Sequence, residues 1–279
     1  MKTTANSSIW VNGKQSETIS ALDRGIQFGQ NVFETISIFE GELLLLNAHL
    51  ERLNKGCKRL QIPVDLKRTQ EEIINIAKQF DKAILRLTMT MGPGERGYQN
   101  PTKPNANRIV SISDYPTLDS SYWSSGITLG LSTVELANQP LLAGLKHGNR
   151  LEQVMARQQW QEGWQEALML DSNKNVIEGT QSNVFIVSGE QLITPDLNQC
   201  GIAGVMREFI LQNAHKCAFE PQIMRLSVDD VKQADEVFLS NSVIGLWPVK
   251  QFQEAVYLDF TASNKLLKLM QDHGAIPTI

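Results

Sequence analysis

Lys146 has the most distinctive chemical setting in this sequence. It follows the apolar run 141–145, Leu-Leu-Ala-Gly-Leu, and precedes His147. An amine in such a place either extends to water or has its pKa lowered, because burial disfavours its charged form. A neutral lysine can form a Schiff base with an aldehyde cofactor and then transfer protons. Most lysines after apolar runs are exposed ends of elements, so the residue alone does not decide between these interpretations.

Two glycine-bearing segments could hold anionic groups. Residues 92–97 match the GxGxxG pattern of dinucleotide-binding proteins, but two prolines follow within seven residues, where that pattern requires a helix. The segment therefore predicts a loop that presents Arg96 and Tyr98 to a carboxylate, or an ordinary exposed hairpin loop. Residues 200–207 do precede a helical pattern, so their amides suit a phosphate. An ordinary strand-to-helix connection would look the same.

Two more loops place polar side chains beside predicted strands. Glu178 precedes a strand near 183–187 and is either a solvated acid or the partner of a ring nitrogen. Residues 240–242, Ser-Asn-Ser, close a strand over 236–239 and could donate hydroxyls to an anion, or form a plain turn. The four histidines are scattered and no GxSxG segment occurs, which disfavours a metal site and a serine hydrolase.

Composition restricts the class of protein. The chain has 279 residues, 42% hydrophobic and 20% charged, with a net charge of −4, which argues against nucleic acid or an anionic membrane as partner. Its three cysteines are widely spaced and indicate reduced thiols. Met1–Trp10 lacks the apolar stretch of a signal peptide, and no run approaches the length of a membrane span. We expect a cytoplasmic protein.

The elements that must position these side chains alternate between helices and strands. Asn47 is the expected cap of a helix that buries one apolar face and ends before Pro63, and a second helix is expected near 69–80. Alternating side chains predict strands over 84–91 and 108–113.

The second half begins after a polar, aperiodic stretch over 116–125, the expected linker. Asn149 and Glu152 resemble a capping box for a helix that buries Leu151, Val154 and Met155. Further strands are expected at 126–134, 167–170, 183–187 and 192–194, with helices from Val205 and over 264–273. The pattern predicts an α+β chain with an N-terminal domain over 1–115 and a larger C-terminal domain over 126–279 that carries Lys146.

Taken in order, these segments resemble the fold-type IV pyridoxal 5′-phosphate (PLP) enzymes. That family contains branched-chain aminotransferases, D-amino-acid aminotransferases and aminodeoxychorismate lyases. The resemblance covers nearly the whole chain. Besides the segments already described, it includes four others: Asp23-Arg24-Gly25, Phe28-Gly29, Phe33-Glu34-Thr35 and His49-Leu50-Glu51-Arg52-Leu53. It implies the two-domain fold of the D-amino-acid aminotransferases.

Two segments look most like the lyases of this family. Residues 142–154 are close to the pattern LAGIKHLNRLEQV, and residues 94–98 are similar to the form GGRGY. The chain departs from the family at Gly148, which replaces a leucine, and at Met206, where aminotransferases usually have threonine. The resemblance implies conversion of 4-amino-4-deoxychorismate to 4-aminobenzoate and pyruvate, in folate biosynthesis. The alternatives are a D-amino-acid or branched-chain aminotransferase, and a catalytically idle homologue, which the intact Lys146, Glu178 and Arg52 disfavour.

The resemblance also implies a role for each candidate residue. Lys146 would bind PLP covalently and act as the base, and Glu178 would pair with the pyridinium nitrogen. Arg150 takes the position of a tyrosine that contacts the cofactor in branched-chain aminotransferases. The phosphate would be held by Arg52, the amides of Val205 and Met206, and the hydroxyl of Ser242. The substrate pocket would include Arg96, Tyr98, Thr35, His147 and Arg24. A homodimer is implied, with the site at the domain interface.

Overall fold

The computed structural model of the protein describes residues 8–277, so the first seven residues of the segment Met1–Trp10 lie outside the described part. The chain forms two compact units. The first extends to Pro116 and includes Leu145–Asn149, and the second comprises Thr117–Gly144 and the chain from Arg150 onward. Both contain helices and a sheet, which confirms the α+β prediction. No helix within residues 8–277 is long and apolar enough to cross a membrane.

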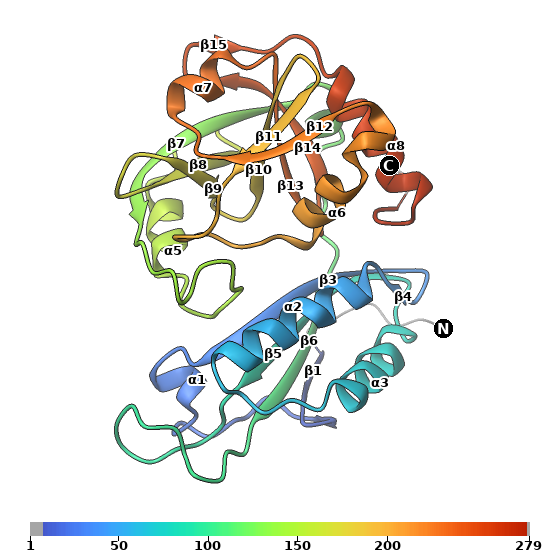
Figure 1. The fold of residues 1–279 in the computed structure, drawn as a ribbon. Helices are drawn as coiled ribbons and strands as arrows, with labels where there is room; N and C mark the ends of the chain where they lie inside the picture. The colour runs from blue at the N-terminus through green and yellow to red at the C-terminus, as the bar shows by residue number, and fades with distance from the viewer. Residues whose placement is uncertain (1–7, 278–279) are drawn as a thin grey trace. The chain divides into compact units, whose positions relative to one another are not determined.

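The first unit is a six-stranded sheet with helices on one face (Figure 1). Its elements are β1 (Ser8–Val11), β2 (Lys14–Gln15), α1 (Arg24–Gln27), β3 (Asn31–Phe39), β4 (Glu42–Leu43), α2 (Leu46–Arg59), α3 (Leu66–Ala77), β5 (Lys82–Thr90) and β6 (Asn107–Asp114). The strand order is β2-β1-β6-β5-β3-β4, and every neighbouring pair is antiparallel. The strands expected over 84–91 and 108–113 are β5 and β6.

The core of the first unit lies between its sheet and α2 with α3. Ile36 of β3 faces Leu85 of β5 across the ladder, and both side chains are fully buried. Leu53 and Cys57, one turn apart on α2, pack into the same cluster. Because side chains alternate along a strand, the neighbours of Ile36 point to the other face of the sheet.

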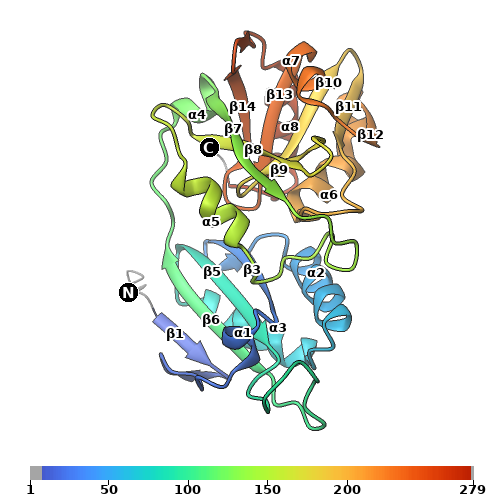
Figure 2. The same cartoon turned by 90° about the vertical axis from the view of Figure 1, so that its left-hand side faces the viewer.

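The second unit contains a nine-stranded mixed sheet (Figure 2). Its elements are α4 (Ser121–Ser124), β7 (Ile127–Leu136), α5 (Leu151–Gln158), β8 (Glu166–Asp171), β9 (Val176–Gly179), β10 (Asn183–Ser188), β11 (Gln191–Pro195), α6 (Val205–Asn213), the 3-10 helix η1 (Ala214–Cys217), β12 (Glu220–Met224), α7 (Val228–Gln233), β13 (Glu236–Asn241), β14 (Gly245–Phe252), β15 (Ala255–Val256) and α8 (Thr261–Asp272). The order is β12-β11-β10-β13-β14-β7-β8-β9, with β15 paired to β14. The sheet curls so that β9 also lies near β10.

Two expected helix caps are wrong. Helix α2 begins one residue before Asn47, and its N-cap is Leu45 in the left-handed conformation, with φ of 53°. Helix α5 has Arg150 as its N-cap, and no side chain caps it. Glu152 does not reach back to Asn149, because its Oε1 accepts a hydrogen bond from the Ala137 amide at 2.9 Å.

The apolar side chains of α5 are not buried as expected. Leu151, Val154 and Met155 are 75%, 49% and 51% exposed, whereas Gln153 and Ala156 are buried. The helical spacing correctly found an apolar stripe, but the stripe does not face the core of the second unit.

Two boundaries in the chain also differ from expectation. The segment over 116–125 contains α4, where Trp123 donates its Nε1 hydrogen to the Ile244 carbonyl at 3.0 Å and so fastens the segment to the second unit. Residues 145–149, expected in the C-terminal domain, belong to the first unit because their backbone bonds to β3.

Candidate active site

The segment that carries Lys146 lies against β3 of the first unit. The Phe33 amide donates to the Lys146 carbonyl at 2.9 Å, and the Gly148 amide donates to the Asn31 carbonyl at 3.2 Å. His147 lies between them, and its Nδ1 accepts from the backbone amide two residues later. A Cβ at Gly148 would lie 2.3 Å from the Asn31 side chain. A leucine at this position, as in the lyase pattern, would therefore require Asn31 to move.

Lys146 shares the ring of Phe33 with a second cation. Its Nζ lies 4.6 Å from the ring centroid, and the Arg86 guanidinium carbon lies 3.7 Å from it. Phe33 and Thr35 point to the sheet face opposite α2, because they alternate with Glu34, which bonds to α2. The Arg86 side chain is exposed to solvent, and partial desolvation by its neighbours lowers its pKa. This arginine is not among the site residues predicted from the sequence, although it is the one charged side chain in the alternating run 84–91.

On the α2 face, Arg52 is held by a buried carboxylate. Glu34 is 1% exposed, and its carboxylate accepts hydrogen bonds from Nε of Arg52 at 2.8 Å and from Nη2 of Arg52. The same carboxylate contacts Nδ1 of His49 at 2.7 Å. Burial alone would raise the pKa of Glu34, but the charge and hydrogen bonds of Arg52, assisted by His49, lower it to about 2. The guanidinium is thus fixed as a cation on the first turns of α2. Its role in phosphate binding stays a prediction.

The loop of Arg96 and Tyr98 joins β5 to β6 and contains no helix, as the two prolines after Gly97 predicted. Both side chains are exposed, which leaves them available to a ligand. Arg24 is only 3% exposed, and it donates to the side chain of Gln30 and to the carbonyls of Gly97 and Tyr98, at 2.6–2.9 Å. Its contacts assign it to holding the loop rather than to a ligand.

In the second unit, Glu178 lies on β9 and not in a solvated loop. It is 3% exposed, and its Oε2 accepts from the Ile202 amide at 2.7 Å. The turn that supplies this amide includes Gly201 with φ of 83°, where a Cβ would lie 2.7 Å from Ile177. Asn183 donates to the Ile202 carbonyl at 2.8 Å and holds the turn from the other side. A buried carboxylate is therefore fixed beside a turn built for close backbone approach.

The same turn ends at the N-terminus of α6. Gly204 is the N-cap, and no side chain accepts a hydrogen bond from the first amides. Those amides, including Val205 and Met206, have no acceptor within the helix, and the helix dipole makes this end positive. A Cβ at Gly204 would lie 1.9 Å from Asn183 Oδ1, so only glycine fits. The nine-residue helix thus presents donors suited to an anion.

Serine hydroxyls lie at the end of β13 near this turn. Ser240 pairs with Asn183 in the ladder, is fully buried, and its Oγ has no hydrogen-bond partner within residues 8–277. Ser242, the predicted phosphate ligand, is half-buried in the turn between β13 and β14. A buried hydroxyl without a partner is rare unless a ligand or water satisfies it.

Glu166, which is not among the residues predicted from the sequence, organises the turn after Glu178. It is 1% exposed and accepts from the amides of Thr180 and Gln181 at 3.1 and 3.2 Å. It also accepts from the hydroxyls of Thr180 and Ser182 at 2.5 and 3.0 Å. One charge therefore fixes three consecutive residues. Its sequence signal is weak, since Glu166 looks like the polar start of an ordinary strand.

Arg150 is half-buried at the start of α5. Burial lowers its pKa, while the charges of Glu178 and Glu152 act in the opposite direction. Arg150 therefore interacts electrostatically with Glu178, which is the predicted partner of the cofactor ring.

The donor set fits PLP. The ring nitrogen needs a carboxylate, which Glu178 provides, and the phosphate needs hydrogen-bond donors, which the start of α6 and the partnerless hydroxyl of Ser240 provide. The aldehyde needs an amine, which Lys146 carries. Within residues 8–277, no group of three or more His, Cys, Asp or Glu side chains is placed to hold a metal ion.

Comparisons with known proteins agree on one family. Residues 31–252 match the amino-transferase class IV family. An aminodeoxychorismate lyase from Vibrio harveyi is 33% identical over 242 residues, which cover 86% of this chain and 89% of that protein. A D-alanine aminotransferase from Bacillus licheniformis is 27% identical over 248 residues, covering 85% of this chain and 86% of the relative.

A solved structure is more similar still in sequence. The crystal structure of a 4-amino-4-deoxychorismate lyase from Pseudomonas aeruginosa aligns with a TM-score of 0.92 and 40% identity, over 95% of this chain and 98% of that one. The expected fold-type IV architecture is thereby confirmed.

Proposed function

The chain belongs to the class IV aminotransferase family, and on that premise we propose that it acts as an aminodeoxychorismate lyase. The observation that carries the proposal is the 40% identity with the Pseudomonas aeruginosa lyase over 95% of the chain. The substrate is 4-amino-4-deoxychorismate, and the products are 4-aminobenzoate and pyruvate. The 4-aminobenzoate would serve folate biosynthesis.

We propose PLP as the cofactor and assign its partners from the chemistry of the donors. Lys146 binds the aldehyde, and Glu178 binds the protonated ring nitrogen. The phosphate is bound by Arg52, by the amides of Val205 and Met206, and by the hydroxyl of Ser242. The partnerless Oγ of Ser240 supports a further hydroxyl contact. When bound, PLP withdraws electrons from the carbon that carries the substrate nitrogen.

Lys146 performs the proton transfers of the reaction. Its Nζ removes the proton from the ring carbon that bears the amino group, as a general base. The C–O bond to the enolpyruvyl group then breaks, the ring becomes aromatic, and the departing enolpyruvate gains a proton to become pyruvate. Phe33 supports this role because its ring lies beneath the amine. The guanidinium of Arg86 lies over the same Phe33 ring, and its positive charge is suited to binding a substrate carboxylate.

The substrate pocket includes the exposed loop side chains Arg96 and Tyr98, together with Thr35 and His147. Arg150 acts beside Glu178, as the pull of that charge on its pKa suggests. Arg24 contributes by holding the carbonyls of the Arg96 loop.

An aminotransferase is the second candidate function. Its support is the 27% identity with a D-alanine aminotransferase over most of the chain. The segment over 142–154, which resembles the lyases, favours elimination over return of the amino group to a keto acid.

We also propose that the protein is a homodimer in the cytoplasm. The apolar stripe of α5 supports self-association, since Leu151 is 75% exposed and Met155 is 51% exposed. The three cysteines are unpaired thiols, two of them buried, which suits a reducing compartment.

The test is conversion of 4-amino-4-deoxychorismate by the purified holoenzyme, followed by detection of 4-aminobenzoate and pyruvate in equal amounts. The Lys146→Ala variant should form neither product. It should also lose the absorbance at about 410–430 nm, because that absorbance comes from the conjugated Schiff base between PLP and the lysine. A colourless wild type that does not respond to added PLP would disprove the proposal.

A further inference from the structure

Asn183 contacts the turn that joins two of the proposed cofactor contacts. It is the first residue of β10 and is 6% exposed. Its Nδ2 donates a hydrogen bond to the Ile202 carbonyl at 2.8 Å, in the turn over 200–204 that precedes α6. Because a carbonyl only accepts hydrogen bonds, the NH2 group of the Asn183 amide must face Ile202, and this fixes the place of its oxygen.

The oxygen of the same amide lies against Gly204. A Cβ at Gly204 would lie 1.9 Å from Asn183 Oδ1, so this oxygen fills the space that a side chain would occupy. Gly204 is the N-cap of α6, and its position sets where the first amides of the helix point. Both polar atoms of Asn183 are therefore used on one turn.

The two places where Asn183 meets the turn serve different proposed contacts of PLP. At Ile202, the backbone amide donates to Glu178 Oε2 at 2.7 Å, while the carbonyl of the same residue accepts from Asn183. At Gly204, the turn continues into the amides of α6 that suit a phosphate. A shift of this turn would move the partner of Glu178 and the phosphate donors together.

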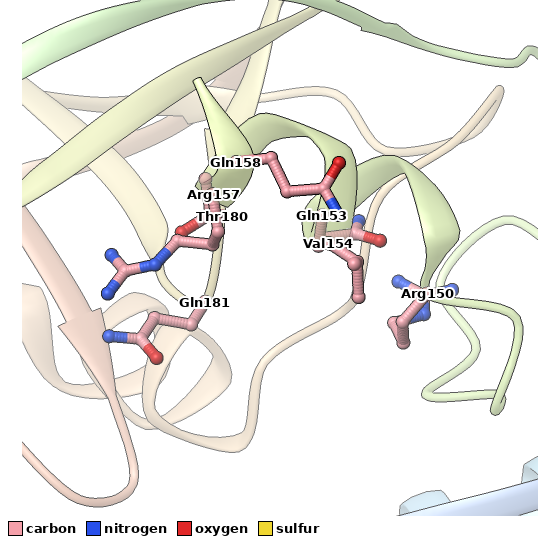
Figure 3. Close-up of a pocket in the computed structure, with 7 residues that line it drawn as sticks. All are labelled: Arg150, Gln153, Val154, Arg157, Gln158, Thr180 and Gln181. Atoms are coloured by element: carbon pink, nitrogen blue, oxygen red, sulfur yellow. The ribbon is translucent and has the colours of Figure 1, made fainter. Parts of the chain in front are cut away.

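The segment over 178–183, which ends at Asn183, is itself held in place. Glu166 accepts hydrogen bonds from the amides of Thr180 and Gln181 at 3.1 and 3.2 Å. The same two residues line a pocket of about 430 Å³ along α5, so the segment has open space on one side (Figure 3). Asn183 is also fixed by the ladder between β10 and β13. It is thus a rigid support for the turn.

We infer that Asn183 is a positioning residue for the cofactor. By holding both Ile202 and Gly204, it keeps the ring contact of Glu178 and the phosphate donors of α6 in place at the same time. The inference rests on the proposed function, because it takes Glu178 and the start of α6 as contacts of PLP. It adds to that function a residue that acts on PLP through the turn.

Hydrogen exchange of the apoenzyme tests the support itself and requires no cofactor. In Asn183→Ala, peptides that cover residues 200–204 should exchange faster than in the wild type, because the Ile202 carbonyl loses its donor. Tyr257→Phe is the matched control, since Tyr257 is 4% exposed and donates its hydroxyl hydrogen to the Val231 carbonyl at 2.6 Å, outside the turn. The control should lower the free energy of unfolding to a similar extent and leave exchange of the turn unchanged.

PLP titration of the apoenzyme tests the effect on the cofactor. Asn183→Ala should bind PLP about tenfold more weakly than the wild type, as expected when a buried hydrogen bond that holds the site is lost. Tyr257→Phe should bind PLP like the wild type.

Pyridoxal, which lacks the phosphate, separates the two ends of the cofactor. Asn183→Ala should also weaken pyridoxal binding, but by a smaller factor, because only the ring contact is then affected. In Glu178→Ala, where the ring contact is already lost, adding Asn183→Ala should no longer weaken pyridoxal binding.

The inference is overturned if Asn183→Ala matches Tyr257→Phe in exchange of the turn and in PLP affinity. An equal loss of PLP affinity in Tyr257→Phe would also overturn it, because the effect would then follow from stability alone. Should Asn183→Ala misfold, Asn183→Asp provides the same comparison, since it keeps the size of the side chain and loses the NH2 group. A wild type that does not bind PLP would refute the proposed function itself, whereas equal PLP affinity of the wild type and Asn183→Ala would refute the role of Asn183 alone.

Discussion

Removal of the Glu166 charge should loosen the turn that follows Glu178. In Glu166→Gln, one carboxylate oxygen becomes an NH2 group. If the retained oxygen keeps the two Thr180 donors, the new NH2 faces the amide of Gln181 and the hydroxyl of Ser182. The hydroxyl can rotate to accept, but the amide cannot, so one buried donor loses its acceptor.

The magnitude follows from this count of donors. One unsatisfied donor corresponds to about 1–3 kcal/mol, so Glu166→Gln should lower the free energy of unfolding by about 2 kcal/mol. Glu166→Ala leaves two amides and two hydroxyls of the turn without the carboxylate, and the loss should be at least twice as large. PLP affinity should fall in the same order, because the turn directly follows the strand of Glu178.

Urea unfolding of the apoenzyme and PLP titration measure the two effects. Lys174→Ala is the control, because it removes an ion pair to Glu135 in which the lysine is 70% exposed, and such pairs contribute about 1 kcal/mol or less. Equal stability of the Gln and Ala variants, or a loss no larger than in Lys174→Ala, would refute the account of this turn.

Three further predictions concern charge, backbone and thiols. Folding lowers the pKa of Glu34 from about 4.5 to about 2. Ionised Glu34 therefore adds about 3 kcal/mol to the free energy of unfolding at pH values above 4.5, and this contribution is lost as the pH falls toward 2. Below about pH 5, the free energy of unfolding should therefore change less steeply with pH in Glu34→Gln than in the wild type. An unchanged slope would contradict this role of Glu34. Gly204→Ala should reduce PLP affinity at least tenfold in a spectral titration, since its Cβ would meet Asn183 at 1.9 Å; undiminished binding would show that the turn is not the phosphate site. Cys217, partly exposed, should react with a thiol reagent before Cys57, whose pKa burial raises to about 12; peptide mapping of the labelled protein gives the order.

The sequence predicted individual elements better than their partners. Alternation in 84–91 identified β5 because a strand with one buried face must alternate, and the glycines of residues 200–207 identified the turn before α6 for a similar local reason. By contrast, Glu34 and Glu166 bond to residues 14–18 positions away, and no local pattern encodes those pairs. Asn149 resembled a cap, yet the backbone around it pairs with β3 and the helix begins later.

Helix α5 illustrates a different limit. Spacing identifies which residues of a helix share a face, but it does not say what covers that face. Leu151 and Val154 were expected in the core, yet they are 75% and 49% exposed, while the polar Gln153 is buried. A surface reserved for a second subunit or a ligand has the same pattern as a core-facing stripe.

The most direct test of the proposed function compares two reactions in one preparation. The wild-type holoenzyme is given 4-amino-4-deoxychorismate in one assay, and D-alanine with 2-oxoglutarate in another, and kcat/KM is measured for each. The lyase proposal predicts that 4-aminobenzoate formation is the faster reaction by a wide margin, and that Lys146→Ala abolishes it. Faster amino transfer from D-alanine, with no 4-aminobenzoate formed, would contradict the proposal.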